Sequence, residues 1–266
     1  MPVELLHTDH FEMEYCFFGE GERAFVILPG LAVQSVMNSA DAIAAQYAAL
    51  TKDYTVYVFD RRKDVPSSYS VYDMAEDTAE AMKALGLTDT DLFGASQGGM
   101  MALWIAITHP ELVRRLILGS SAVYVDEGRI KGLEEWVALA KAKDGVGLYR
   151  SFGKKVYPKA VYDQYVGVLE ELGKTVTEEE FERFVIFAEG TKGFDVREDI
   201  DKISCPVLIL GSKDDHVLGE EAVYEAIEAF KGKEMISYVY KDYGHAAYDL
   251  APDYLQRIVR FCKGVY

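Results

Sequence analysis

Basic residues and long apolar runs are both scarce in this chain of 266 residues. It carries 28 lysines and arginines against 44 acidic residues, a formal net charge of -16. Nucleic acid is therefore not expected as a partner, because a polyanion would be repelled on average. The longest apolar run, after Gly99, is far shorter than the roughly 18 residues that span a bilayer, so no membrane span is expected. The first twenty residues lack the basic start and apolar segment of a signal peptide.

Cysteine is also rare, with Cys16, Cys205 and Cys262 far apart and each beside apolar residues. An odd number of widely spaced cysteines suits reduced thiols in the core of a cytoplasmic protein. None lies in a glycine-framed turn, so a catalytic cysteine is not expected. No cluster of cysteine and histidine has the spacing of metal ligands, and we expect neither a metal nor an organic cofactor.

Apolar residues make up 50% of the chain, and they alternate between two kinds of segment. Short apolar runs bounded by turn residues predict strands, and most are separated by amphipathic helical patterns. This alternation predicts a parallel sheet covered by helices on both faces, preceded by an antiparallel hairpin. The predicted strands of the sheet are 25–28, 55–59, 91–93, 115–118, 206–210 and 235–240.

The alternation is interrupted between residues 122 and 198, where only helical patterns occur. One of them begins with Thr177 and Glu180, the spacing of a capping box. The segment 122–198 is therefore predicted to be a helical lid inserted into an α/β core made of 1–121 and 199–266. We expect most of the lid aromatics to form the lid's own core and the remainder to line a pocket: Trp136, Tyr149, Phe152, Tyr162, Tyr165, Phe181, Phe184 and Phe187.

The stretch "FGASQGGMMALW" places Ser96 between a predicted strand and a predicted helix. A strand-to-helix turn of one residue would strain the serine and expose its hydroxyl, and it would require tiny neighbours at Gly94 and Gly98. The backbone N–H of Gln97 would then be free at the helix start, where it could stabilise an oxyanion. The alternative is a plain glycine-rich turn or a phosphate loop, although the lysine of a Walker loop is missing.

A serine nucleophile needs a histidine base and an acid that orients it. Among the five histidines, His7 and His10 lie in the predicted hairpin and His109 at a helix end. His216 is a closer rival, but His245 follows the last predicted strand, at the sheet edge where the Ser96 turn also lies. His245 is therefore the predicted base.

Two neighbouring carboxylates, Asp214 and Asp215, follow the predicted strand 206–210. Both lie in the loop after the strand, and only one of them can orient the imidazole. Alternatively, both could be loop carboxylates at the N-terminus of the next predicted helix. The residues alone leave this choice open.

The motifs "GASQGG", "LPGLAVQS", "FDRR", "GSKDDHV" and "YGHAAYDLAPDYLQRIVRF" together resemble the α/β-hydrolase superfamily, in its lid-bearing branch. The resemblance implies a mostly parallel eight-stranded sheet flanked by helices, with the lid after strand six. It also implies Ser96 after strand five, the acid at Asp214 after strand seven and His245 after strand eight. The second oxyanion donor would be the backbone N–H of Leu31, although Pro29 stands where the family usually has histidine.

The predicted activity is hydrolysis of an ester or related acyl bond of a small to medium, apolar substrate through an acyl-enzyme on Ser96. Two alternatives stay open. The same triad serves cofactor-free carbon–carbon bond hydrolysis and perhydrolysis, and a hydrolase-like ligand sensor keeps the triad but turns over little. The lid sequence identifies neither the substrate nor the oligomeric state.

Overall fold

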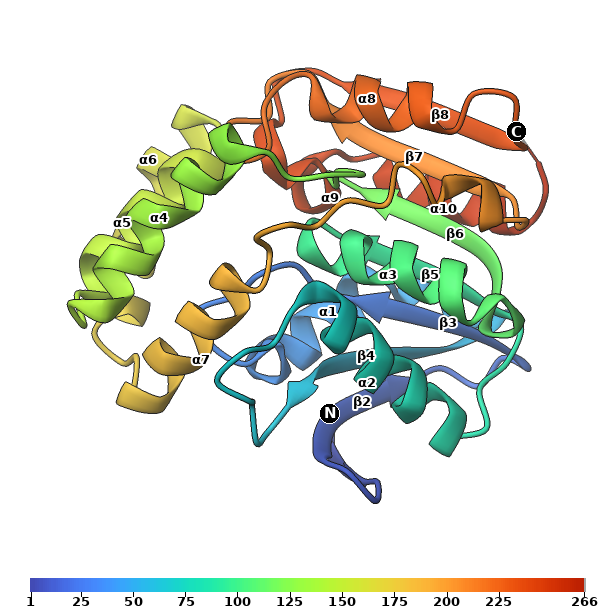
Figure 1. The fold of residues 1–266 in the computed structure, drawn as a ribbon, viewed down its shortest axis with the longest axis horizontal. Helices are drawn as coiled ribbons and strands as arrows, with labels where there is room; N and C mark the ends of the chain where they lie inside the picture. The colour runs from blue at the N-terminus through green and yellow to red at the C-terminus, as the bar shows by residue number, and fades with distance from the viewer. Residues whose placement is uncertain (266) are drawn as a thin grey trace.

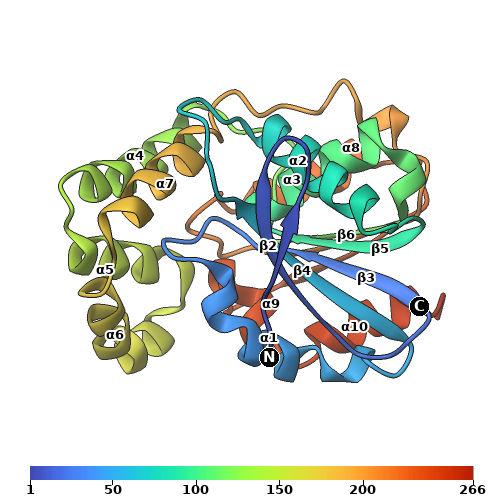
Figure 2. The same cartoon turned by 90° about the horizontal axis from the view of Figure 1, so that it is seen from below.

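The computed structural model describes residues 1–265, which form one eight-stranded sheet with helices on both faces (Figures 1 and 2). The strand order is β1-β2-β4-β3-β5-β6-β7-β8. The pairs β1–β2 and β2–β4 are antiparallel, and all other pairs are parallel. The predicted hairpin and mostly parallel sheet are thus confirmed. The strands are β1 (Glu4–His7), β2 (Glu12–Phe18), β3 (Arg23–Leu28), β4 (Tyr54–Arg62), β5 (Thr90–Ala95), β6 (Val113–Gly119), β7 (Val207–Ser212) and β8 (Met235–Tyr240).

The helices outside the β6–β7 connection divide between the two faces of the sheet, as Figure 2 shows. On one face lie α2 (Val71–Ala84), α3 (Gln97–Thr108) and α8 (Ala222–Ala229). On the other lie α1 (Ala40–Gln46), α9 (Ala247–Leu250) and α10 (Tyr254–Cys262). Every residue of β5 and β7 is buried, as expected for strands covered on both faces. Short 3-10 turns complete the chain: η1 (Val36–Ser39), η2 (Ala48–Leu50), η3 (Pro110–Leu112), η4 (Ile200–Lys202) and η5 (Gly244–Ala246).

Helix α2 illustrates how the sequence pattern becomes packing. Its buried residues include Val71, Met74 and Met82, whose spacing places them on one face of the helix. Ser70 and Asp73 form a reciprocal capping box at its start. Just past its end, Gly86 has φ +70°, a conformation that glycine adopts without strain, so the helix stops there.

Four helices lie together beyond one end of the sheet, between β6 and β7 (Figure 1). They are α4 (Glu127–Lys141), α5 (Gly145–Val156), α6 (Lys159–Gly173) and α7 (Glu178–Glu189), and we call them the helical insertion. The predicted capping box of Thr177 and Glu180 starts α7. The two connections to the insertion run side by side through the bridge between Tyr124 and Asp195. The predicted division of the chain into core and lid at 122 and 198 stays a prediction.

The three cysteines are free thiols, with Cys16 and Cys262 buried and Cys205 half-buried. Burial raises the pKa of the Cys16 and Cys205 thiols to about 11, so neither is a reactive thiolate near neutral pH. Within residues 1–265, every helix is too short or too polar to cross a membrane.

Candidate active site

Ser96 occupies the single residue between β5 and α3. Its backbone has φ +52° and ψ −122°, a region that side-chain-bearing residues rarely adopt. The surrounding structure holds this strain, because the Ser96 N–H donates to the Gly119 carbonyl at 2.8 Å and the Ser96 carbonyl accepts from Ser121 Oγ at 2.8 Å. The turn therefore has the strained form that the sequence predicts.

The glycines around Ser96 are required by contacts with backbone. A Cβ on Gly94 would lie 2.3 Å from the Gly98 carbonyl oxygen. A Cβ on Gly98 would lie 2.0 Å from the Leu28 carbonyl oxygen, which no side-chain movement could relieve. Gly99 makes room for Ser121 in the loop after β6, where a Cβ would lie 2.5 Å from the serine side chain.

His245 lies in η5, directly after Gly244, whose φ of +59° turns the chain after β8. Its Nδ1 is 2.7 Å from Oδ2 of Asp215, and both side chains are buried. The other oxygen, Asp215 Oδ1, accepts the backbone N–H groups of Val217 at 2.8 Å and Leu218 at 2.9 Å. Because a carboxylate can only accept, Nδ1 carries the proton, and Nε2 of the neutral ring is left as the base.

Opposing effects act on the pKa of Asp215. Burial alone would raise it, but the His245 imidazole and the two backbone N–H donors outweigh burial and lower the pKa of the carboxyl below its ordinary value. Asp215 is therefore ionised at neutral pH and can stabilise an imidazolium on His245.

The prediction that Asp214 orients His245 is wrong. Asp214 Oδ1 accepts from Ser212 Oγ at 2.8 Å, and its Oδ2 accepts the Gly244 N–H at 3.2 Å. Asp214 thus links the end of β7 to the backbone of the loop that carries His245. The carboxylate that contacts the His245 imidazole is that of Asp215. The rival histidine, His216, has its side chain exposed in the same loop and does not line the cavity described next.

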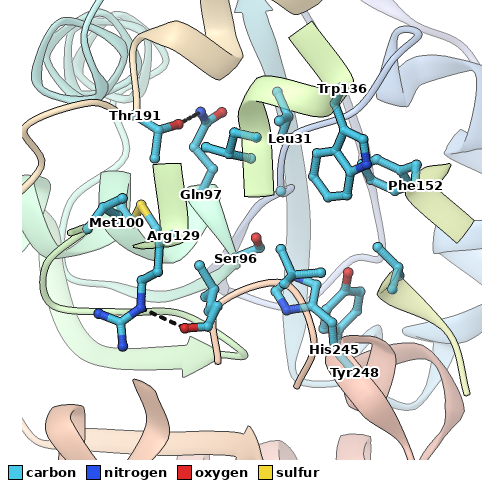
Figure 3. A pocket seen from close by; sticks show the side chains of 16 residues that line it. Leu31, Ser96, Gln97, Met100, Arg129, Trp136, Phe152, Thr191, His245 and Tyr248 are labelled. Carbon is cyan, nitrogen blue, oxygen red and sulfur yellow. Dashed lines mark hydrogen bonds between the residues drawn. The ribbon is translucent and has the colours of Figure 1, made fainter. Parts of the chain in front are cut away.

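Ser96 and His245 line one cavity, together with Gly30, Leu31 and Gln97 (Figure 3). The space between the lining atoms is about 540 Å³, including the open mouth. Gly30 approaches the serine so closely that a Cβ there would lie 3.1 Å from Ser96 Cβ. The loop with Pro29 in place of histidine therefore still approaches the serine closely at Gly30, the residue before Leu31. The roles of Leu31 and Gln97 as oxyanion donors stay predictions.

Side chains of the helical insertion form the far wall of the cavity. Trp136 from α4 and Phe152 from α5 line it, with ring centroids 4.7 Å apart (Figure 3). Phe181 and Phe184 instead pack in a core cluster between α4, α5 and α7, and Tyr165 is exposed. As predicted from the sequence, only part of the aromatic set reaches the pocket.

Arg129 and Tyr248 are further polar residues on the cavity wall, and neither was predicted from the sequence. Arg129 is buried and already bonded, with Nε donating to the Leu218 carbonyl at 2.6 Å and Nη2 paired with Glu225 at 2.6 Å. The Tyr248 ring stands edge-on to His245 with the ring centroids 6.1 Å apart, and Tyr248 lines the cavity. Burial raises the Tyr248 pKa, so the hydroxyl stays a donor. Its place in "GHAAYDL", three residues after the histidine, was the available signal.

Comparison with known families gives one match, to a family described as alpha/beta hydrolase fold, over residues 23–152. The matched segment contains β3, the Leu31 loop, the Ser96 turn, α4 and the first part of α5. It ends before Asp215 and His245, whose placement rests on the geometry above.

Individual proteins match over most of the chain. The protein that carries the name carbamate hydrolase RutD in Serratia proteamaculans is 24% identical over 251 residues, which cover 88% of this chain and 90% of the relative. The 3-oxoadipate enol-lactonase 2 of Acinetobacter baylyi is 22% identical over 256 residues, covering 88% and 92%. Among solved structures, MGS-M2, an alpha/beta hydrolase enzyme from a Medee basin deep-sea metagenome library, superposes with a TM-score of 0.85 at 19% identity, covering 99% and 98%.

Proposed function

The chain belongs to the α/β-hydrolase superfamily and is an enzyme of the hydrolase type, and from this premise we propose that it is a serine hydrolase acting on an ester or related acyl bond. The observation that carries the proposal is the joint placement of a strained Ser96 and a buried His245–Asp215 pair around one cavity. A glycine-rich turn without this role would not need a histidine at the same cavity or a buried carboxylate behind it.

In the proposed mechanism, His245 Nε2 takes the Ser96 hydroxyl proton while Ser96 Oγ bonds to the acyl carbon. The N–H groups of Leu31 and Gln97 hold the oxygen that becomes negatively charged. His245 then returns the proton to the leaving group as the acyl bond breaks. Water, deprotonated by the same imidazole, releases the acid from the acyl-enzyme and restores Ser96.

The cavity wall supports an uncharged, apolar acyl group of small to medium size. The Gln97 amide and the Arg129 guanidinium line the cavity, but their hydrogen bonds go to protein atoms. A charged acyl chain would therefore lose its hydration without a matching partner. The Tyr248 side chain also lines the cavity, and its protonated hydroxyl can donate to the substrate.

The two relatives favour the same bond type. Their names describe hydrolysis of a carbamate and of an enol lactone, both of which contain an acyl carbon bonded to oxygen or nitrogen. Because both identities are below 25%, they support the class of bond and leave the particular substrate of this chain to experiment.

The test is turnover of neutral p-nitrophenyl esters from acetate to octanoate, alongside a half-ester whose acyl chain ends in a carboxylate. We expect Ser96-dependent turnover of the short and medium neutral esters, and at least about tenfold lower kcat/KM for the charged one. Ser96→Ala is the matched control. Equal turnover by Ser96→Ala would contradict the nucleophile assignment. Serine labelling by a fluorophosphonate with negligible turnover of every ester would favour the sensor alternative.

A further inference from the structure

We propose that Arg61 is a positioning residue for the oxyanion hole, holding together the two loops that carry its two donors. This inference rests on the proposed function, since it concerns the same Ser96 chemistry. Arg61 lies near the end of β4 and is only 5% exposed.

A single nitrogen of Arg61 contacts both loops. Its Nη2 donates to the Pro29 carbonyl at 2.9 Å and to Gln97 Oε1 at 3.1 Å. The Pro29 carbonyl is one peptide before the Leu31 N–H, and Gln97 is the residue whose own N–H is the other donor. The two hydrogens of Nη2 thus fix the relative positions of the Leu31 loop and the Ser96 turn.

The Gln97 amide has one orientation that satisfies its neighbours. Its Nε2 donates to the Phe187 carbonyl at 2.7 Å and to Thr191 Oγ1 at 2.8 Å (Figure 3). Because the Phe187 carbonyl can only accept and the Arg61 guanidinium can only donate, the amide oxygen must face Arg61. Arg61 and the end of α7 therefore hold Gln97 from opposite sides, and hydrogen bonds fix its amide at both hydrogens and at the oxygen.

The neighbouring residue secures the same loop at a second point. Asp60 Oδ2 accepts from Ser35 Oγ at 2.5 Å, and Asp60 Oδ1 accepts the Arg61 N–H at 2.7 Å. The loop from Pro29 to Ser35 is thus held near both ends by consecutive residues of β4.

Burial of the Arg61 guanidinium is energetically unfavourable for the fold. Burial lowers the pKa of its guanidinium, against the opposing effect of Asp60. Within residues 1–265 it makes no ion pair shorter than 4.0 Å, and its Nε has no hydrogen-bond partner. A buried cation with such incomplete compensation destabilises the fold, so a functional reason for its presence is expected. Proline at position 29 supplies no N–H of its own to hold the loop, and Arg61 holds its carbonyl instead.

The test compares Arg61→Met with Arg62→Met. Arg62 is the matched control, since it is adjacent, largely buried, and bonded to Asp77 and the His10 carbonyl, away from the serine turn. For each variant, kcat, KM, the thermal midpoint and the affinity for a trifluoromethyl ketone, which forms a tetrahedral adduct with an oxyanion, are measured. Arg61→Met should lower kcat and ketone affinity by the same factor, at least about tenfold, with KM within about twofold. Methylguanidinium in the buffer should restore part of the lost rate.

Arg61→Lys keeps the charge and can reach one acceptor, so it should lose less than Arg61→Met, and it serves as the test if Arg61→Met does not fold. The proposal is overturned if the folded Arg61 variant matches Arg62→Met in kcat and ketone affinity. It is also overturned if KM rises while ketone affinity is unchanged. Failure of the serine-hydrolase proposal is distinct, since the wild type itself would then show no Ser96-dependent turnover.

Discussion

Asp215→Asn is expected to remove most of the activity because it reverses the proton on His245. The Asp215 oxygen Oδ1 accepts two backbone N–H groups, so the amide oxygen of an asparagine must take that position. The amide nitrogen then faces His245 Nδ1, at the place where Oδ2 now lies 2.7 Å away. An N–H donor at this place turns Nδ1 into an acceptor and moves the ring proton to Nε2, which can no longer take the Ser96 proton.

The expected loss is large because the geometry is kept while the tautomer is wrong. In serine hydrolases this change costs about 10⁴-fold in kcat, which corresponds to about 5 kcal/mol of transition-state stabilisation. Asp214→Asn keeps an oxygen that can accept from Ser212 or Gly244 and does not touch the imidazole, so its loss should stay within about tenfold.

The assay is kcat for a p-nitrophenyl ester, measured for both variants together with their thermal midpoints. The Asp214 variant controls for the removal of one charge from this loop. The reasoning is refuted if two folded variants lose equal activity, or if Asp214→Asn loses more.

Three further predictions follow from the geometry. Gly98→Ala places a Cβ 2.0 Å from a backbone oxygen and should lower the free energy of unfolding, measured in urea, by about 3 kcal/mol or more. Gly86→Ala meets open space and should lower it by only about 1 kcal/mol, because of the positive φ. Equal losses would contradict the close packing at the serine turn. Phe152→Ala enlarges the cavity and should raise the octanoate-to-butyrate ratio of kcat/KM by about tenfold, and an unchanged ratio would remove Phe152 from the acyl site. Because the folded-state pKa of Asp215 is lowered, its ionised carboxylate stabilises the fold above the unfolded pKa of about 3.9, and this stability is lost as pH falls through the folded pKa. The difference in unfolding free energy between wild type and Asp215→Asn should therefore shrink below about pH 4. A difference that grows would contradict the pairing of Asp215 with His245.

Sequence patterns predicted the parts of the fold that depend on local and periodic signals. The strand segments and the hairpin follow from apolar spacing and turn residues, and the start of α7 follows from its capping box. Helix α5 was harder to predict, because its glycines at 145, 147 and 153 weaken the helical pattern. Helix packing explains two of these glycines, since a Cβ on Gly145 or Gly153 would collide with α6.

The sequence predicted which loops form the candidate site, but it did not predict which side chains contact one another there. Ser96 and His245 follow from their positions after strands, because carboxyl ends of parallel strands meet at one edge. The choice between Asp214 and Asp215 depends on how one turn directs two consecutive side chains, and no spacing rule contains that information. Arg61 was also missed, because its partners Pro29 and Gln97 lie 32 and 36 residues away in sequence.

The central claim, that Ser96 is the nucleophile served by His245, is tested most directly by trapping the acyl-enzyme. Wild-type protein is mixed with p-nitrophenyl butyrate, quenched in acid during the first turnover and digested for mass spectrometry. The account predicts one butyryl group, on the peptide that contains Ser96, and none in Ser96→Ala. A butyryl group on another residue, or turnover by Ser96→Ala at the wild-type rate, would contradict it.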